Sequence, residues 1–187
     1  MNQDDQALID AVGRGDASAF EQIYRAHKDV LLTATIFVLG GDCSGAEDVL
    51  HDVFVRFAEH AREVKLKAGL RAYLMASCLN RARDVLRRRL KNLPSDTPLI
   101  DHAEYGHDPV AMACATEESA RVMEALLKLT DEQREVMTLR TCGALRFREI
   151  AAVLGISLDT VKSRYRYALS RLQQTLATEE SAKEKES

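Results

Sequence analysis

Hydrophobic residues recur at intervals of three and four along most of the chain, which is the spacing of one face of an α-helix. The clearest example is residues 129–172, LTDEQREVMTLRTCGALRFREIAAVLGISLDTVKSRYRYALSRL. Within it, Gly155 interrupts the apolar pattern and Ser157 is placed to cap the next helix. The segment therefore predicts two helices joined by a three-residue turn at residues 155–157, which is a helix-turn-helix.

The second helix of this motif has two different faces. One face is apolar and carries Leu158, Val161, Tyr165, Ala168, Leu169, Leu172 and Leu176. The other is polar and cationic and carries Lys162, Ser163, Arg166 and Ser170. We expect the first face to pack and the second to enter a DNA groove, although a charged face is also typical of a helix that only meets solvent.

Four more helices are predicted before residue 92. They cover residues 4–12, a segment from Ala17 that ends at Gly40 and Gly41, a segment that starts after Ser44, and residues 70–91. Asp16 and Ser44 are the expected caps of the second and third. The third should bury an apolar stripe of Val49, Leu50, Val53, Phe54 and Phe57.

All three prolines fall between residues 92 and 114, a composition that resists helix formation. A helix resumes at about residue 117, and Thr130 with Gln133 predicts a capping box for another over residues 131–141. We therefore predict an all-α fold of two small helical domains joined by a flexible linker. The boundaries are 1–91 for the first domain, 92–114 for the acidic linker, 115–177 for the second domain and 178–187 for a charged tail that frays.

Composition agrees with a helical protein, since Trp is absent and only 5% of residues are aromatic. No apolar run has the length of a membrane span and no targeting signal is visible, so we expect a cytoplasmic protein without membrane insertion. The four cysteines form no CxxC pair and the five histidines no HExxH motif, which favours buried small cysteines and argues against a metal, a cofactor or an enzyme.

Charge is unevenly distributed along the chain, although the net charge is only −3. Residues 71–91 hold seven cations and one acid, residues 92–120 hold six acids and no Lys or Arg, and residues 140–172 hold seven cations and two acids. Two basic segments separated by an acidic one are suited to a protein that contacts DNA at two places.

Five segments of the chain, taken in order, resemble the extracytoplasmic-function sigma factors of bacteria. Region two of that family is similar to GDASAFEQIYRAH, AEDVLHDVFVRF and LRAYLMASCLNRARDVLRRR, and region four to LTDEQREVMTLR and FREIAAVLGISLDTVKSRYRYALSRL. The resemblance implies a protein that binds core RNA polymerase, directs it to promoter DNA and helps to open the DNA, without catalysis or a small-molecule substrate of its own. It also implies an anti-sigma factor as a regulatory partner.

By the same resemblance, the third helix docks on the polymerase. The implied contacts are Glu47, Asp48, Asp52, Phe54 and Arg56. For Phe54 and Phe57, core packing is the alternative, because both lie on the inward stripe.

The fourth helix resembles the part of the family that holds the minus-10 element and its separated strand. Such binding needs cations for phosphates and flat groups for bases. The implied residues are Arg71, Tyr73, Asn80, Arg81, Arg83, Arg87 and Arg88. Tyr73 either stacks on a base or covers the core.

The helix-turn-helix resembles the part that reads the minus-35 element in the major groove. The implied residues are Ser157, Thr160, Lys162, Ser163, Arg164 and Arg166. Lys162 and Arg166 lie one turn apart, and each is able to read a guanine or to bind a phosphate.

Two other functions are compatible with parts of this pattern. A sigma-like mimic would occupy an anti-sigma factor without binding DNA, but it should lack the groove-facing cations. A dimeric helix-turn-helix regulator would leave the first domain without an explanation.

Overall fold

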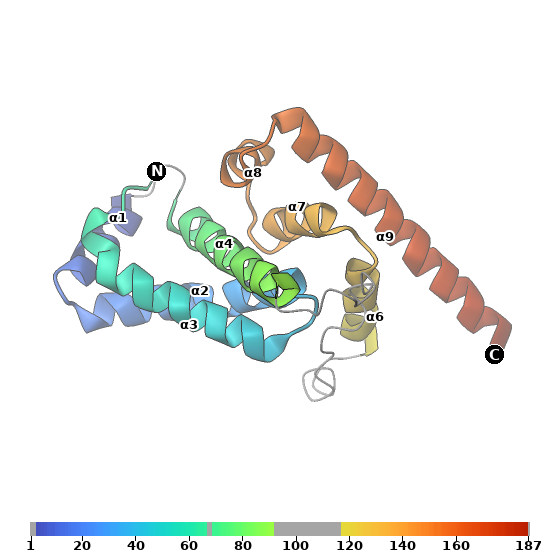
Figure 1. Ribbon diagram of the computed structural model, residues 1–187, viewed down its shortest axis with the longest axis horizontal. Coiled ribbons are helices and arrows are strands. Elements are labelled where there is room, and N and C mark those ends of the chain that lie inside the picture. The colour runs from blue at the N-terminus through green and yellow to red at the C-terminus, as the bar shows by residue number, and fades with distance from the viewer. Residues whose placement is uncertain (1–2, 67–68, 92–116, 187) are drawn as a thin grey trace.

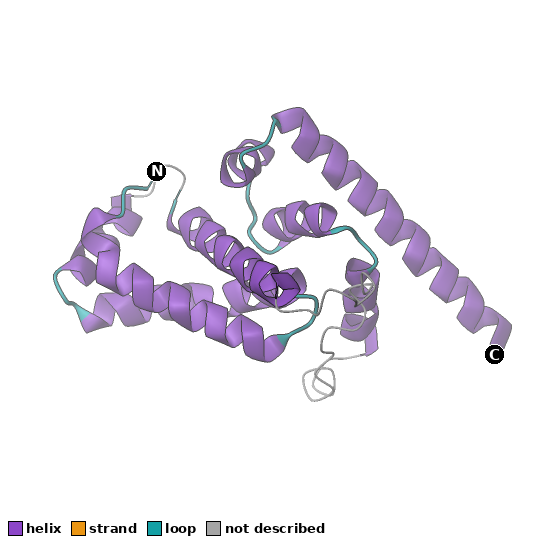
Figure 2. Cartoon of the chain, viewed as in Figure 1, coloured by secondary structure: helices purple, strands orange, loops and turns teal. Residues whose placement is uncertain are grey.

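We describe the protein from a computed structural model, which covers residues 3–66, 69–91 and 117–186. These residues form helices joined by short turns, with no strand in the described ranges (Figure 2). The predicted all-α class is therefore confirmed. The predicted linker, residues 92–114, and Cys114 lie outside the described residues.

The first part of the chain is a bundle of helices that pack around one apolar core. It comprises α1 (Gln3–Gly13), α2 (Ala17–Val38), α3 (Cys43–His60), the 3₁₀ helix η1 (Ala61–Glu63) and α4 (Leu70–Lys91). Helices α2, α3 and α4 contact one another in pairs, and α1 closes one end against α2 and η1 (Figure 1). Among the side chains fully buried in this core are Ile9, Ile23, Leu31, Val49, Leu74 and Met75.

The second part comprises α6 (Glu117–Leu127), α7 (Asp131–Thr141), α8 (Phe147–Leu154) and α9 (Leu158–Glu186). Helix α9 packs across α6, α7 and α8, and its C-terminal half extends past the other helices (Figure 1). Helix α7 also packs against α2, and α8 against α4, so the two parts are in contact.

The ends of the helices follow the sequence signals in most places. Asp16 caps α2, and Thr130 with Gln133 forms the predicted capping box of α7. Gly155 ends α8 with a left-handed φ of 67°, and the Ser157 hydroxyl accepts the Thr160 amide proton at 3.0 Å at the start of α9. The helix-turn-helix is thus formed as predicted.

The predicted cap of the third helix was wrong. The cap is Asp42, whose carboxylate accepts the Gly45 amide proton at 2.8 Å, and Ser44 already lies inside the first turn. Asp and Ser cap helices about equally well, so the local sequence did not decide between two positions two residues apart.

Helix α9 continues to Glu186 through a segment rich in Glu, Ala and Lys, which are strong helix formers. That the tail frays stays a prediction. A second prediction for this helix was wrong. Leu169, expected on the packed stripe, is 41% exposed, whereas the adjacent Ala168 is fully buried.

The cysteines follow the expected burial only in part. Cys78 is buried, and this burial raises the pKa of its thiol to about 12. Cys43 and Cys142 are half-buried. Cys78 and Cys142 are free thiols.

A buried arginine joins α6 to α7. The Arg134 guanidinium donates hydrogen bonds to the carbonyls of Leu126 at 3.1 Å, Leu127 at 3.1 Å and Leu129 at 3.0 Å. These carbonyls end α6 or follow it, where a helix leaves acceptors unsatisfied and where a positive charge is favourable. Asp131 pairs with the same guanidinium at 3.3 Å. The sequence analysis did not identify Arg134 as a structural residue.

We expect Arg134→Ala to lower the free energy of unfolding by about 3 kcal/mol, because it leaves three carbonyls without their donor. Urea unfolding followed by circular dichroism measures this change. Arg25→Ala is the matched control, since among the described residues Arg25 pairs only with exposed Glu21, and its loss should cost less than about 0.5 kcal/mol. Equal losses for the two variants would contradict the role of Arg134.

A second long-range contact ties the end of α4 to the start of α3. The Arg89 guanidinium pairs with the Asp42 carboxylate, and a side chain at position 45 would collide with both groups. Partial burial opposes ionisation of Asp42, but the Gly45 amide and Arg89 outweigh it and hold the pKa of Asp42 below its ordinary value. Asp42 therefore stabilises the fold in its ionised form.

Because the pKa of Asp42 is lower in the folded than in the unfolded chain, its contribution is present at neutral pH and is lost as the pH falls below about 4. We expect Asp42→Asn, which keeps a capping group, to cost about 1 kcal/mol at pH 7 and progressively less towards acid pH. Urea unfolding at a series of pH values tests this, with exposed Asp29→Asn as the control. A pH-independent cost would rule out the ionised Asp42 as its origin.

Candidate nucleic-acid interface

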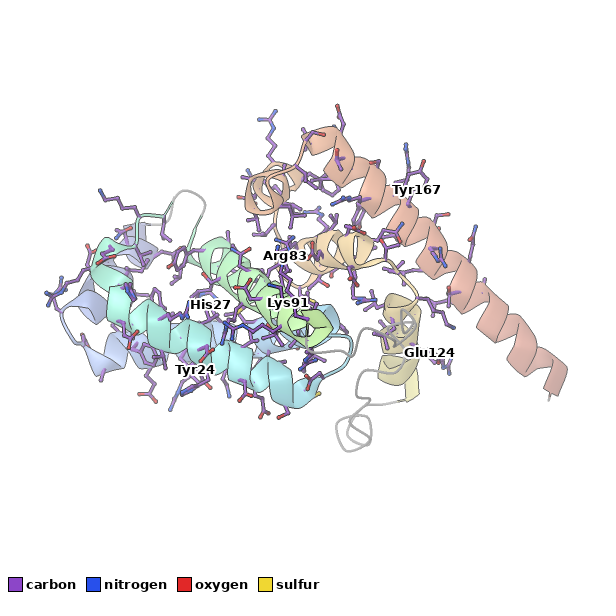
Figure 3. All side chains as sticks on the ribbon, viewed as in Figure 1. Tyr24, His27, Arg83, Lys91, Glu124 and Tyr167 are labelled. Atoms are coloured by element: carbon purple, nitrogen blue, oxygen red, sulfur yellow. The ribbon has the colours of Figure 1, made fainter. Side chains whose placement is uncertain are left out.

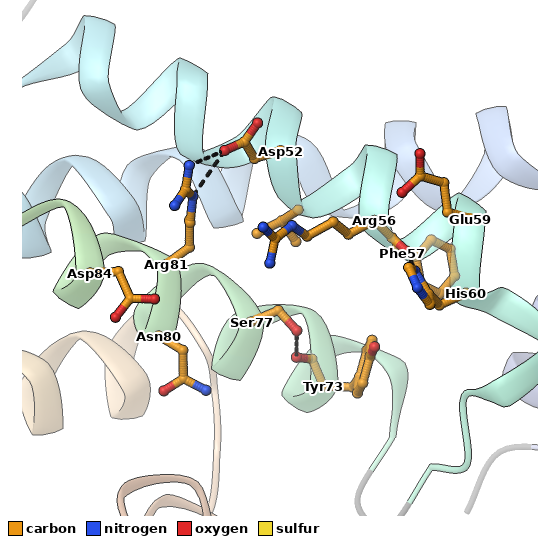
Figure 4. A pocket seen from close by; sticks show the side chains of 11 residues that line it. Asp52, Arg56, Phe57, Glu59, His60, Tyr73, Ser77, Asn80, Arg81 and Asp84 are labelled. Carbon is orange, nitrogen blue, oxygen red and sulfur yellow. Dashed lines mark hydrogen bonds and ion pairs between the residues drawn. The ribbon is translucent and has the colours of Figure 1, made fainter.

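A pocket of about 600 Å³ lies between α3 and α4 (Figure 4). It combines an aromatic ring, an amide and cationic groups, which are the side chains that hold an unstacked nucleobase and its phosphate. The residues that α3 contributes include Asp52, Arg56, Phe57, Glu59 and His60, and those from α4 are Tyr73, Ser77, Asn80, Arg81 and Asp84.

Tyr73 contacts the core and also lines the pocket. Its half-buried ring lies 6.4 Å from the ring of Phe57, centroid to centroid, and it also lines the pocket. Asn80 lies two turns further along α4 and is exposed. The structure thus brings Tyr73 and Asn80, two of the residues predicted for the minus-10 element, to one pocket.

Arg81 and Asp52 pair with each other across this pocket. The sequence analysis had placed Asp52 at the polymerase contact and Arg81 at the minus-10 element. Their pairing means that Arg81 is not a free cation in this structure, and that Asp52 faces α4.

Arg56 was also predicted for the polymerase contact, but it lines the pocket together with His60 and Ser77. Its side chain is exposed, and no carboxylate in the described part of the chain pairs with it. Sequence reasoning missed His60 and Ser77 because their place in the pocket depends on how α3 and α4 pack.

The remaining cations of α4 differ in their surroundings. Arg83 and Arg71 face the second part of the chain: Arg83 donates to both carboxylate oxygens of Glu135 at 2.6 Å, and Arg71 donates to the carbonyl of Cys142. The hydrogen bonds with Glu135 raise the pKa of Arg83. Arg87 pairs with exposed Asp84 at 3.3 Å, and Arg88 is exposed.

The outer face of α3 carries the predicted acidic residues. Glu47 and Asp48 are exposed, whereas Phe54 is buried, with its ring 4.8 Å from that of Tyr24 and 6.0 Å from that of Phe20. Phe54 therefore packs beneath this surface and is not itself exposed on it. The sequence analysis missed Tyr24, an exposed aromatic ring with the Lys28 ammonium 6.0 Å from its centroid.

At the helix-turn-helix, two of the six predicted residues are exposed cations. Lys162 and Arg166 are solvent-accessible, and the Arg166 guanidinium lies 5.6 Å from the ring of Tyr167, which is 61% exposed on α9 (Figure 3). The other four take part in local contacts: Ser157 and Thr160 share a hydrogen bond of 2.8 Å, Ser163 donates to the Thr160 carbonyl, and Arg164 is half-buried.

The charge of Arg164 influences the Glu132 carboxyl on α7. A backbone hydrogen bond, the Thr130 hydroxyl and the charge of Arg164 together lower the pKa of Glu132. The charge of Arg164 on α9 therefore acts on a carboxylate of α7.

Two kinds of feature are absent from the described residues. No helix there has the length and apolar character needed to cross a membrane. No cluster of three or more His, Cys, Asp or Glu side chains there is placed to hold a metal ion.

A bundle with a polar pocket, followed by a helix-turn-helix with exposed cations, defines a helical DNA-binding protein. Comparison with known proteins identifies its class. The family "Sigma-70, region 4" matches residues 119–172. The ECF RNA polymerase sigma factor SigK of Mycobacterium tuberculosis is 30% identical over 179 residues, which cover 94% of this chain and 95% of that protein.

Further similar proteins point to the same class. The RNA polymerase sigma-E factor of Streptomyces antibioticus is 31% identical, with 89% of each chain covered. CnrH, solved in complex with the cytosolic domain of CnrY, is 27% identical, with a TM-score of 0.68 over 93% of this chain and 97% of CnrH. The fold is also that of RpoE from Bartonella quintana, with 23% identity and a TM-score of 0.63 over 84% of this chain and 96% of RpoE. The chain belongs to the extracytoplasmic-function sigma factors.

Proposed function

We propose that this chain binds core RNA polymerase and directs it to promoters whose minus-10 element is held at the α3–α4 pocket and whose minus-35 element is read by α9. The observation that carries the proposal is the pocket, which gathers Tyr73, Asn80 and Arg56 from two helices in a member of this family. The proposed domains are residues 1–91 and 115–177, with 92–114 as linker and 178–187 as tail.

At the minus-10 element, the proposed ligand is a base of the separated strand. The exposed side of the Tyr73 ring offers a surface for stacking, which contributes about 1–3 kcal/mol per base. The Asn80 amide has both a donor and an acceptor for a base edge. Arg56 supplies a positive charge at the same pocket for the strand's phosphate.

At the minus-35 element, α9 is proposed to enter the major groove by its N-terminal turns. Lys162 and Arg166 lie one turn apart and are exposed, so they are the residues free to reach bases or phosphates. Ser157, Thr160 and Ser163 form hydrogen bonds with one another in the first turns of the helix. These three residues thereby help to position the two cations, and Arg164 adds a positive charge beside α7.

The polymerase contact is proposed at the outer face of α3. Glu47 and Asp48 give that face a negative charge, which requires a basic partner surface. Phe54 supports the face from the core, and Tyr24 adds an exposed ring beside it. In this scheme the chain forms part of an enzyme assembly and supplies no catalytic group itself.

A regulatory partner is a further part of the proposal. CnrH was solved with the cytosolic domain of CnrY, and we expect this chain to bind an anti-sigma factor. The exposed cations Lys162 and Arg166 favour a DNA-binding protein over a mimic that only sequesters such a partner.

Transcription with purified core polymerase on a genomic DNA library tests the proposed function. We expect the chain to bind core polymerase and to give transcripts that start at a common pair of sequence elements. If the chain binds no core polymerase and no transcripts start, the proposed function is wrong.

Arg56→Ala separates the two roles considered for this residue. If Arg56 contacts the minus-10 strand, the holoenzyme should bind a single-stranded minus-10 oligonucleotide roughly tenfold more weakly, as expected for the loss of one phosphate contact at low salt. The affinity for core polymerase should not change. Asp48→Asn is the matched comparison, for which we expect weaker binding to core polymerase and unchanged binding to the oligonucleotide. If Arg56→Ala weakens binding to core polymerase, Arg56 belongs to the polymerase contact and not to the minus-10 site.

Arg166→Ala tests the recognition helix. If Arg166 reads a base, binding to minus-35 DNA should weaken by about 1–3 kcal/mol, and if it binds a phosphate the salt dependence of log K should fall by about one. Exposed Arg171→Ala on the same helix serves as the control. Unchanged affinity at all salt concentrations would exclude both roles.

A further inference from the structure

His60 and Ser77 line the α3–α4 pocket together with Tyr73, and neither belongs to the set predicted from the sequence. His60 is the last residue of α3, and Ser77 lies one turn after Tyr73 on α4. Figure 4 shows the rings of His60 and Tyr73 at the same end of the pocket. The two residues therefore add polar atoms close to the proposed stacking surface.

A hydrogen bond within α3 fixes which ring nitrogen of His60 carries a proton. The Nδ1 atom lies 3.0 Å from the carbonyl oxygen of Arg56, one turn earlier in the helix. Because a carbonyl oxygen has no proton to give, Nδ1 must be the donor of this bond. The uncharged ring then has no proton on Nε2, which is left as a hydrogen-bond acceptor.

The proton of Ser77 is committed in the same way. Its hydroxyl donates to the backbone carbonyl of Tyr73 at 3.0 Å, which is the bond drawn within α4 in Figure 4. With its single proton engaged, the half-buried oxygen has only lone pairs left for a ligand. Both polar groups are therefore acceptors towards the pocket.

The backbone that carries His60 is held in place. Helix α3 passes directly into η1, whose first residue, Ala61, is 1% exposed. The Arg62 Nε atom donates to the carbonyl of Gly13, which ends α1. His60 is thus presented from a fixed corner of the bundle, although its ring is exposed and open to a ligand.

We propose that His60 and Ser77 are specificity-determining residues, which accept hydrogen bonds from the exocyclic amino group of the base that lies beside Tyr73. The base is then adenine, cytosine or guanine, and thymine is excluded. This inference rests on the proposed function, which supplies single-stranded minus-10 DNA as the ligand.

The exclusion of thymine follows from the chemistry of the bases. Adenine, cytosine and guanine each carry an amino group with two protons, whereas thymine carries only carbonyl oxygens and a methyl group on its ring. A carbonyl oxygen placed against Nε2 of His60 or Oγ of Ser77 brings two acceptors together, and neither gains a partner. Each lost hydrogen bond should lower the affinity about threefold, so the two together should disfavour thymine about tenfold.

The test measures binding of the holoenzyme, which is this chain with core polymerase, to fluorescein-labelled single-stranded minus-10 oligonucleotides. Each position in turn carries each of the four bases. It then carries an analogue of the preferred base without its amino group: purine for adenine, uracil for cytosine or hypoxanthine for guanine. At one position we expect thymine and the analogue both to bind about tenfold more weakly than the preferred base.

Variants connect this preference to the two residues. His60→Phe keeps a ring but removes the acceptor, and Ser77→Ala removes the hydroxyl, so each should reduce the discrimination at that position to about threefold. The double variant should abolish it, whereas His60→Gln, which keeps an acceptor, should retain most of it. Thr33→Ala is the matched control, because the Thr33 hydroxyl makes the same kind of bond to the Asp29 carbonyl, at 2.8 Å on α2, and does not line the pocket. Circular dichroism checks the folding of each variant.

Unchanged discrimination in both His60→Phe and Ser77→Ala would overturn the proposal, and so would thymine that binds as tightly as the other bases at every position. Failure of the proposed function is distinguishable, because a chain that starts no transcripts with core polymerase is then tested alone with the same oligonucleotides. A preference for the amino-bearing base that the variants lose would still support the assignment of His60 and Ser77. If neither the holoenzyme nor the chain alone binds any of the oligonucleotides, the assignment is wrong.

Discussion

The arginines of α4 are the groups on which the rest of this structure depends. One face of the helix is buried through Leu74, Cys78 and Ala82. From the rest of its surface, Arg89 pairs with the cap of α3, Arg81 pairs with the middle of α3, and Arg83 pairs with α7. Helix α4 is thus held in place by apolar packing and by three carboxylates that are distant in sequence.

These pairs explain how a strongly basic helix is compatible with a compact fold. Unpaired, the cations of residues 71–91 would repel one another, whereas each carboxylate neutralises one of them at a fixed position. The three pairs need not serve the same purpose. Arg89 and Asp42 connect two ends of one bundle, whereas Arg83 and Glu135 connect two parts of the chain that the proposed function requires to contact DNA separately.

The sequence predicted the local features well. The limits of α4 and α7, the capping box at Thr130 and the left-handed Gly155 all depend on neighbouring residues and on helical periodicity, so they are visible in a short stretch of sequence. The predicted surface cations Lys162 and Arg166 are exposed for the same reason, because the apolar stripe of α9 determines which face is buried.

What the sequence did not predict depends on contacts between distant segments. The pairing of Arg83 with Glu135 spans 52 positions, and nothing in the local pattern distinguishes Arg83 from the exposed Arg88. In the same way, Arg56 and Asp52 were assigned to the polymerase side of α3, although the packing of α3 on α4 turns both towards the pocket. Arg134 was missed because its partners are backbone carbonyls, which carry no sequence signal.

The most direct test of the central claim is a structure of the chain bound to core polymerase on an opened promoter, determined by electron cryomicroscopy. We predict a base against Tyr73 in the α3–α4 pocket, Lys162 and Arg166 in the major groove of the upstream element, and Arg83 on a phosphate with α7 away from α4. An empty pocket with Arg83 still paired to Glu135 would contradict this interpretation of the fold.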